Sequence, residues 1–348
     1  MGEIALLIDS MEFSGPARQA LSLALEFTSQ GRKIALCSLG KSTPWLNKAE
    51  EAGAVVEALN WQGVLDLAPL FRLRQWLKKR PARVIAFGAS SLNAMALVAP
   101  KLLGRTLAFL HPRMLKRPSW FFKKTLARVE KALCPTLQMR EFLSANGLGE
   151  KAIHLAPGIS PLLHPVLPKQ EKPPYLYLGG PFHQFPGNRD TVWAMDILYL
   201  VRPELRLLAI GEGKALPEIQ EFQQALNSPG AVQFPGACRA VEPLLDGAEM
   251  VLVPNHSPGG IYSVLEGMLA GKTVLASRVP GMEEILRHGE TGILIEPGEP
   301  ALWAREIHSL LDDADKRQRV GDNARLAAGH YFSAKRNASS LLALYDRG

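Results

Sequence analysis

The chain has 348 residues, of which 47% are hydrophobic and 21% charged, a balance typical of a globular protein with about two domains. It contains no apolar run of about 18 residues, which argues against a membrane-spanning helix, and its three cysteines fit neither a disulfide framework nor a metal cluster. The net charge of +7 is uneven: residues 1–165 contain 22 basic and 11 acidic side chains, so we expect the first half to meet something anionic.

Signals for localisation and partners are few. The segment Met1–Ser10 has the pattern of a first strand and lacks the basic stretch that begins a signal peptide. Three widely spaced cysteines suit a reducing compartment, so the sequence predicts a cytoplasmic protein. Nucleic acid, an anionic membrane and a phosphorylated acceptor all suit the basic charge. No recognisable nucleic-acid-binding module accompanies that charge, so we expect no nucleic acid partner.

Short apolar strands alternate with helical segments through the first half of the chain. Apolar residues at helical spacing, followed by Gly31, predict a helix over Ala17–Gln30. The predicted strands are Ile4–Ile8, Lys33–Ser38, Ala54–Leu59, Arg83–Phe87, Thr106–Leu110, Lys131–Cys134 and Ala152–Ala156. This alternation predicts βαβ units and a parallel sheet.

The second half repeats this alternation after a proline-rich segment near 160–173, which we interpret as a stiff interdomain linker. The predicted strands are Tyr175–Gly179, Leu207–Gly211, Val232–Phe234, Met250–Pro254, Thr273–Ser277 and Gly292–Ile295. The predicted helices are Asp190–Val201, Ile261–Ala270, Leu302–Asp312, Lys316–His330 and Ala334–Tyr345. The fold class is therefore α/β, with two doubly wound parallel-sheet domains.

Ligands of such sheets bind where strands end and helices begin, and three loops have suitable residues. Ser14 and Gly15 precede the first helix, where backbone amides and the helix dipole favour an anion. Gly211-Glu212-Gly213 closes another strand. Both loops are equally well explained as plain turns.

The third loop, Pro254–Ile261, has a stronger signal. Adjacent Gly259 and Gly260 at a helix start, with Ile261, let backbone amides approach a diphosphate closely. Glu266 follows on an otherwise apolar helix, where its carboxylate needs a partner, and a ribose diol offers two hydroxyl donors. The alternatives are a solvated glutamate or a pair with Arg278.

With these residues, the sequence resembles glycosyltransferase family 4, the retaining enzymes of GT-B fold. The most specific stretch is Ala248–Pro297, which is similar to the family's run through its Glu-x7-Glu motif and its "E-I-V-x-x-G-x-T-G-x-L-V" segment. Weaker similarities are Ser14-Gly15 to a Gly-Gly pair, His111 to a strand-end His, Ala152–Ser160 to the linker entry, Gly211–Gly213 to "G-D-G", and Phe332–Arg347 to the closing helix.

This resemblance implies two Rossmann-like domains facing each other across a cleft. We expect an N-terminal acceptor domain at 1–162, a C-terminal nucleotide-sugar donor domain at 163–330, and a final helix at 331–348 that packs back on the first domain. It also implies that Glu266 holds the donor ribose and that His111 faces the reacting centre. The resemblance further implies a nucleoside-diphosphate sugar as the donor, and we expect neither a metal nor another cofactor.

Three donor-contacting residues of the family are missing. Pro258 stands where the family has the first Glu of its motif, and Gly180 stands where it has an Arg. Phe185 or Pro186 takes the place of its Lys. The lost cations each supply about 1.5–3 kcal/mol to a bound diphosphate.

The nearby substitutes for these cations are Arg189, His183 and His256. Arg189 is the first choice, although a surface arginine on a helix is an equal explanation. Two alternatives to a working transferase therefore stay open, a non-catalytic GT-B scaffold and an epimerase-type isomerase of nucleotide sugars.

The segment 113–131 concentrates basic residues beside aromatic ones, a composition typical of a surface that meets an anionic bilayer. The residues we expect at such a membrane or acceptor surface are Lys116, Arg117, Trp120, Phe121, Lys123 and Lys124. Enzymes of the resembling family often act on lipid or polysaccharide acceptors at the inner face of the cell membrane, which predicts a peripheral cell-envelope enzyme. The alternative is a solvated helix whose aromatic residues pack inward.

Overall fold

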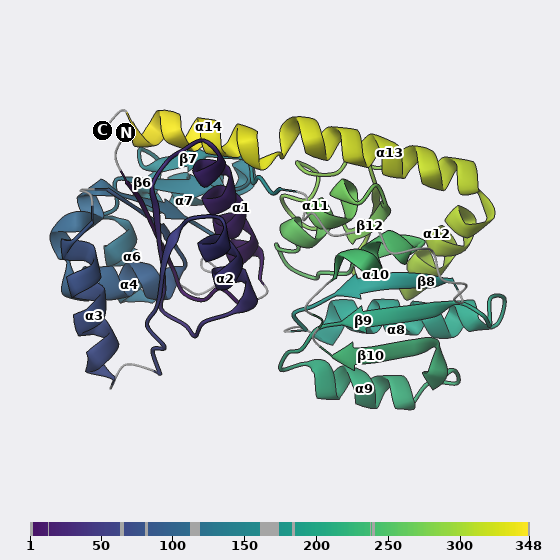
Figure 1. The fold of residues 1–348 in the computed structure, drawn as a ribbon. Helices are drawn as coiled ribbons and strands as arrows, with labels where there is room; N and C mark the ends of the chain where they lie inside the picture. Colours follow the sequence, from purple (N-terminus) through teal and green to yellow (C-terminus); the bar gives the residue numbers. More distant parts are fainter. Residues whose placement is uncertain are drawn as a thin grey trace. The chain divides into compact units, whose positions relative to one another are not determined.

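The computed structural model divides the chain into two compact units (Figure 1). The first unit contains residues 1–160 together with 331–348, and the second contains residues 161–330. The structure describes residues 3–12, 14–62, 66–80, 83–111, 119–160, 174–182, 185–236, 238 and 241–346.

The first unit is built on a parallel sheet of seven strands in the order β3-β2-β1-β4-β5-β6-β7. The strands are β1 (Ile4–Ile8), β2 (Ile34–Ser38), β3 (Val55–Ala58), β4 (Val84–Phe87), β5 (Thr106–Phe109), β6 (Lys131–Cys134) and β7 (Ala152–His154). The order reverses between β1 and β4, which pair in parallel, and this is the switch point at which doubly wound sheets bind ligands.

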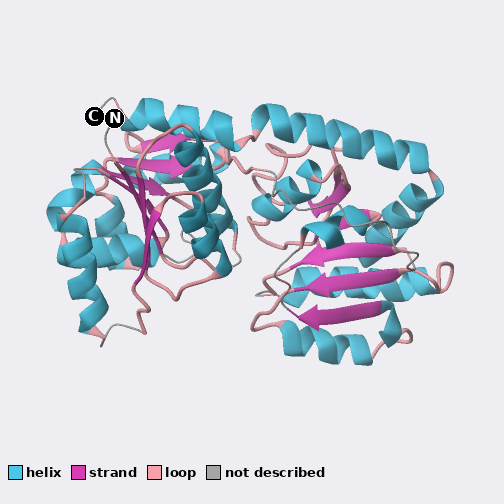
Figure 2. Ribbon diagram, viewed as in Figure 1, coloured by secondary structure: helices cyan, strands magenta, loops and turns pink. Residues whose placement is uncertain are grey.

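Helices cover both faces of this sheet, because the central strands are buried on both sides (Figure 2). One face packs against α3 (Leu67–Lys78), α4 (Ala89–Val98), α6 (Trp120–Leu126) and α7 (Leu137–Leu143), and the short helices η1 (Pro100–Arg105) and η2 (Ser144–Leu148) follow α4 and α7. The other face packs against α1 (Gly15–Ser29), α2 (Pro44–Glu51) and the last helix of the chain, α14 (Ala334–Tyr345).

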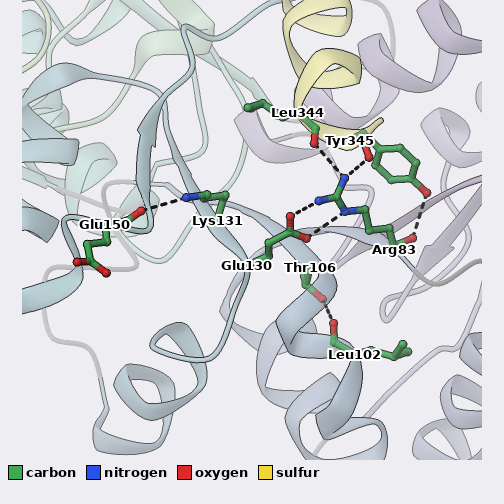
Figure 3. Close-up of polar contacts among 8 residues, drawn as sticks. All are labelled: Arg83, Leu102, Thr106, Glu130, Lys131, Glu150, Leu344 and Tyr345. Carbon is green, nitrogen blue, oxygen red and sulfur yellow. Dashed lines mark hydrogen bonds and ion pairs between the residues drawn. The ribbon is translucent and has the colours of Figure 1, made fainter. Parts of the chain in front are cut away.

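A charged cluster at the amino edge of this sheet holds the end of α14 (Figure 3). Arg83, just before β4, donates to the carbonyl oxygens of Leu344 and Tyr345 and binds both carboxylate oxygens of Glu130. The Tyr345 hydroxyl donates in turn to the Arg83 carbonyl at 3.2 Å. These bonds fix the end of α14 to the sheet of the first unit.

The second unit repeats the same strand order in six strands, β10-β9-β8-β11-β12-β13. They are β8 (Tyr175–Gly179), β9 (Arg206–Ile210), β10 (Val232–Gly236), β11 (Met250–Val253), β12 (Thr273–Ser277) and β13 (Ile293–Ile295). One face packs against α8 (Phe185–Tyr199), α9 (Leu216–Gln224) and α12 (Pro300–Asp312). The other elements are η3 (Pro229–Ala231), α10 (Glu242–Gly247), α11 (Ile261–Leu269) and α13 (Ala314–Tyr331).

The predicted α/β class with two parallel sheets is confirmed, and most predicted strand ends agree within two residues. The main difference is α8, which begins at Phe185 rather than at Asp190. Pro186 is compatible with the first turn of a helix because the amide it lacks has no partner there. Gly187 permits the start because a side chain at that position would collide with the Pro254 carbonyl.

None of the helices in the described part of the chain is long and apolar enough to cross a membrane.

Candidate functional site

The switch point of the second sheet lies between β8 and β11, which pair in parallel. The segments that leave these strands at their carboxyl ends are Gly180–Phe182, which leads toward α8, and Pro254–Gly260, which leads into α11. The topology therefore places the predicted loop Pro254–Ile261 at the edge where doubly wound sheets bind their ligands.

The start of α11 has the features of an anion site. Its N-cap residue Gly260 is in the left-handed conformation, at φ 77°, and a side chain there would collide with Asn255 and Val253. The neighbouring Gly259 has open space beside it, because the nearest atom to an added Cβ, the Ser257 carbonyl oxygen, would be 4.0 Å away. The first turn of α11 contains no acidic residue, so the positive end of the helix dipole is not neutralised from within the helix.

Glu266 lies in the second turn of this helix and is half-buried. Tyr262 lies one turn before it on the same side of the helix, and burial raises the pKa of the Tyr262 phenol. Arg278, the alternative partner considered for Glu266, binds Glu283 and Glu296.

Close backbone packing occupies the position where the resembling family has an arginine. The Gly180 amide donates to the Ile210 carbonyl at 2.7 Å. A Cβ on Gly180 would lie 3.2 Å from the Gly211 Cα, and one on Gly211 would lie 2.9 Å from the Gly180 Cα. Gly211 therefore serves the close approach of the segments after β8 and β9. His183 lies outside the described residues, as do the side chains of Phe185 and Pro186.

A second cluster joins α8 to two loops at the same edge of the sheet. Asp190 on α8 is fully buried, and its Oδ2 accepts from the Gly298 amide at 2.8 Å and contacts His256 Nε2 at 2.5 Å. Its Oδ1 has no hydrogen bond within the described part of the chain. The Arg189 guanidinium is 3.9 Å from that oxygen and lies over the Trp193 ring.

In the first unit, Ser14 is the N-cap of α1, where its hydroxyl accepts from the Ala17 amide at 3.4 Å, and Gly15 is the first helical residue. His111 is half-buried and follows β5 by two residues. Since β1 and β5 flank β4 in a parallel sheet, these residues all lie at its carboxyl edge. Asp9, which had not been predicted, also lies there and accepts from the Ser91 amide, the Ser91 hydroxyl and the Ser90 amide.

The predicted basic surface is described in part. Lys116 and Arg117 lie outside the described residues. On α6, Trp120 and Phe121 are 68% and 39% exposed, and Phe122 is buried in the core. Lys123 is exposed, and the Lys124 Nζ lies 4.0 Å from the centroid of the Trp120 ring. The inward-packing alternative therefore holds for Phe122 and not for its two neighbours.

Two of the cysteines, Cys37 and Cys134, are buried in the first unit. Burial raises the pKa of the Cys37 thiol and raises that of Cys134 to about 12, so neither is a reactive thiolate at neutral pH. Among the described residues, no group of three or more His, Cys, Asp or Glu side chains could hold a metal ion.

Asp190 had been predicted only as the start of a helix and not as a site residue. Its partner His256 is 66 residues away in the chain, so no local spacing connects them. The available signal was a charged residue in a segment whose other positions, such as Val192 and Ala194, are core residues.

Residues 165–327 match the family model "Glycosyl transferases group 1". EpsD of Bacillus subtilis, whose name assigns it to the glycosyltransferases, is 32% identical over 160 residues, which cover 46% of this chain and 42% of EpsD. N-acetyl-alpha-D-glucosaminyl L-malate synthase of Bacillus anthracis is 27% identical over 164 residues, which cover 47% of this chain and 43% of that protein.

The similarity to these curated relatives thus spans less than half of their length. A solved structure shows the fold of the whole chain: Alr3699/HepE of Anabaena, in complex with UDP and glucose, has a TM-score of 0.83 over 99% of this chain and 100% of that one, at 16% identity. Residues 165–327 thus match the group 1 glycosyl transferases, and the chain, with its two doubly wound parallel-sheet units, has the GT-B fold.

Proposed function

We propose that the chain is a retaining glycosyltransferase that moves a sugar from a nucleoside-diphosphate sugar to an acceptor. The observation that carries the proposal is the start of α11, where Gly259 has open space beside it and Gly260 leaves the helix end without a side-chain cap. Backbone amides at such a helix start suit a diphosphate. The family match over residues 165–327 supports the same assignment.

In this proposal the second unit binds the donor. The amides of Gly259, Gly260 and Ile261 meet the diphosphate and sugar, and Glu266 accepts hydrogen bonds from the ribose hydroxyls. Gly211 keeps the neighbouring loop close to Gly180. The nucleotide sugar is the substrate, and the proposed reaction uses no resident cofactor. The description of HepE as a complex with UDP and glucose supports a nucleotide sugar as the donor class.

In this proposal the first unit binds the acceptor. Ser14 and Gly15 present the start of α1, and His111 at the end of the β5 segment orients the sugar or acceptor. The acceptor class we propose is a lipid or polysaccharide of the cell envelope, because the basic charge of this half favours an anionic partner.

Calorimetric titration tests the donor site. A panel of UDP, GDP and ADP identifies the nucleotide that binds the wild-type protein. Glu266→Ala should then weaken that nucleotide and its parent nucleoside by the same factor, several-fold or more, because both contain the ribose. Glu284→Ala, which alters a glutamate after β12, is the control and should change neither. Wild-type affinity in Glu266→Ala would remove the ribose assignment.

A second candidate function is a non-catalytic GT-B scaffold that binds a nucleotide sugar or a partner. It is favoured by the closed backbone at Gly180 and by Pro258 at the position of the family's first Glu. Mass spectrometry of donor hydrolysis and product formation, across nucleotide sugars and lipid extracts, separates the two functions. Turnover by the wild-type protein excludes the scaffold. If nucleotide binds without turnover, and Pro258→Glu creates none, the scaffold is the better description.

We also propose that α6 brings the protein to the inner face of an anionic membrane. Exposed Trp120 and Phe121 beside Lys123 and Lys124 combine apolar contact with positive charge, and each basic residue near such a surface contributes about 1 kcal/mol. Co-sedimentation with vesicles should rise with anionic lipid and fall with salt, because the Debye length shrinks from about 10 Å at 0.1 M to about 3 Å at 1 M.

Point variants distinguish binding of vesicles by α6 from nonspecific adsorption of the protein. Lys123→Glu with Lys124→Glu should abolish the preference for anionic vesicles, and Trp120→Ala should weaken binding to them. Phe71→Ala, which removes another exposed aromatic side chain of the first unit, should not. Equal binding to neutral and anionic vesicles would contradict the electrostatic part of the proposal.

A further inference from the structure

The cluster of Asp190, His256 and Arg189 lies beside the switch point of the second sheet. Asp190 is on α8, the helix that follows β8, and His256 is in the loop that follows β11. The contact between them therefore joins the two segments that flank the switch point. Gly298, which donates to the same carboxylate oxygen, follows β13 at the same edge.

The carboxylate fixes the orientation of the imidazole. Asp190 is fully buried, and its Oδ2 lies 2.5 Å from His256 Nε2; with Asp190 as an ionised carboxylate, which only accepts hydrogen bonds, His256 Nε2 is the donor in this contact. The side chain of His256 is 25% exposed. Within the described part of the chain, its Nδ1 forms no hydrogen bond, which leaves this atom for a ligand.

The charges of the cluster also favour an anion. Asp190 contributes one negative charge, and the Arg189 guanidinium at 3.9 Å from Oδ1 offsets it. The positive charge of a protonated His256 is then surplus in the cluster. A buried carboxylate needs one cation as its partner, and the Arg189 guanidinium already lies beside this one.

We propose that His256, held by Asp190, binds the diphosphate of the donor and takes over the part played by the missing arginine and lysine. This inference rests on the proposed function. The protonated imidazole donates its Nδ1–H to a phosphate oxygen. As the bond between sugar and phosphate breaks, the bonding electrons stay on the phosphate oxygen, and this hydrogen bond becomes stronger without transfer of the proton. Asp190 and Arg189 are positioning residues that act through His256.

Calorimetry with a nucleoside diphosphate and its parent nucleoside tests the role of His256. The probes are UDP, GDP and ADP, with uridine, guanosine and adenosine. A hydrogen bond to a charged group contributes about 1.5–3 kcal/mol, so His256→Ala should weaken the diphosphate by roughly 10- to 100-fold. The affinity for the nucleoside should stay at the wild-type value. His256→Gln keeps a donor toward Asp190 without a positive charge and should show the same selective loss.

The variant Asp190→Asn should produce a smaller loss in the same direction, because the imidazole remains but its orienting charge is gone. The control is His308→Ala. His308 forms an exposed pair with Asp312 on α12, with 3.5 Å between Nε2 and Oδ2, so its removal should change neither affinity. Circular dichroism of each variant confirms that the fold is intact.

The outcomes distinguish this inference from the donor-site proposal. If the wild-type protein binds none of the nucleotides, both are wrong. If it binds one and His256→Gln, correctly folded, binds it equally well, the inference alone is wrong. If His256→Ala and His256→Gln weaken nucleoside and diphosphate equally, His256 supports the loop structurally and does not contact the phosphates.

Discussion

The charged cluster around Arg83 lies at the amino ends of the strands of its sheet, and the charged cluster around Asp190 lies toward the carboxyl ends of the strands of the other sheet. Arg83 lies at the amino edge of the first sheet, and its guanidinium binds Glu130 and two carbonyl oxygens of the last helix (Figure 3). Asp190 lies toward the carboxyl edge of the second sheet, with Oδ1 lacking a hydrogen bond in the described part of the chain and with a partly exposed histidine as its partner.

The two clusters differ in whether their hydrogen-bonding groups are all used within the protein, and we relate this difference to stability and to ligand binding. At the amino edge the donors of Arg83 are used within the protein, so the cluster stabilises the first unit and leaves nothing for a ligand. At the carboxyl edge one oxygen of the buried Asp190 carboxylate has no hydrogen bond in the described part of the chain, and this edge is where doubly wound sheets bind their ligands. Variants that change one cluster at a time should therefore separate stability from ligand binding.

The largest expected effect is the loss of stability in Arg83→Met. Arg83 is 10% and Glu130 25% exposed, so removing the cation leaves a largely buried carboxylate and two helix-end carbonyls without their donor. Breaking such a pair costs about 3 kcal/mol or more. Denaturant unfolding should measure this loss, and nucleotide affinity of the folded variant should equal that of wild type.

The matched control is Arg72→Met. Arg72 pairs with Glu57 at 3.3 Å, with 49% and 35% of the two side chains exposed. An exposed pair contributes about 1 kcal/mol or less. Equal losses in the two variants would mean that the Arg83 cluster is no more important than a surface ion pair, and a loss of nucleotide affinity in Arg83→Met would place function at the amino edge.

An intermediate effect is expected from Gly187→Ala at the start of α8. The added methyl group would collide with the Pro254 carbonyl, which is backbone and cannot rotate away. Overpacking of this kind costs about 1–3 kcal/mol, and the shift moves Asp190 away from His256. We expect a lower midpoint of denaturation together with weaker nucleoside diphosphate binding.

The control for this variant is Gly230→Ala, where nothing lies within 4 Å of an added Cβ. Its free energy of unfolding should stay within about 0.5 kcal/mol of wild type. If Gly187→Ala lowers stability and leaves diphosphate affinity unchanged, the distance between α8 and the His256 loop does not matter for the ligand.

The starts of α11 and α8, both in the second unit, differ in how far sequence alone could predict them. The start of α11 was predicted because its signals are local: a buried strand, two adjacent glycines and an apolar helix with one glutamate all lie within Met250–Leu269. The start of α8 was not, because Pro186 and Gly187 disfavour a helix locally. Only the distant Pro254 carbonyl explains the glycine. The pairing of Asp190 with His256 likewise depends on which strands become neighbours in the folded sheet.

The smallest expected effect concerns Asp9. It tests whether a carboxylate at the carboxyl edge of a sheet binds a ligand because of its position or because one of its oxygens lacks a hydrogen bond. This residue lies at the switch point of the first sheet, yet both its carboxylate oxygens accept hydrogen bonds from the first turn of α4. If a ligand site requires an oxygen without a hydrogen bond, Asp9 only caps α4, because both its oxygens already accept hydrogen bonds. Asp9→Asn should then leave nucleotide affinity unchanged. Its contribution should then appear only in stability.

The pH dependence of that stability follows from the direction of the pKa shift. Burial is the largest influence and raises the pKa of Asp9, despite opposing hydrogen bonds from Ser91 and Ser90. The folded state therefore binds the proton more tightly than the unfolded state, whose carboxyl titrates near about 3.9. The stabilisation is full below that pH and is lost as the pH rises through the folded-state pKa. Unfolding free energies of wild type and Asp9→Asn, measured from pH 4 to 7, should show the wild type losing stability relative to the variant. If the wild type instead gained stability relative to Asp9→Asn as the pH rises, the hydrogen bonds from α4 would outweigh burial. The folded first unit would then stabilise the ionised form of Asp9.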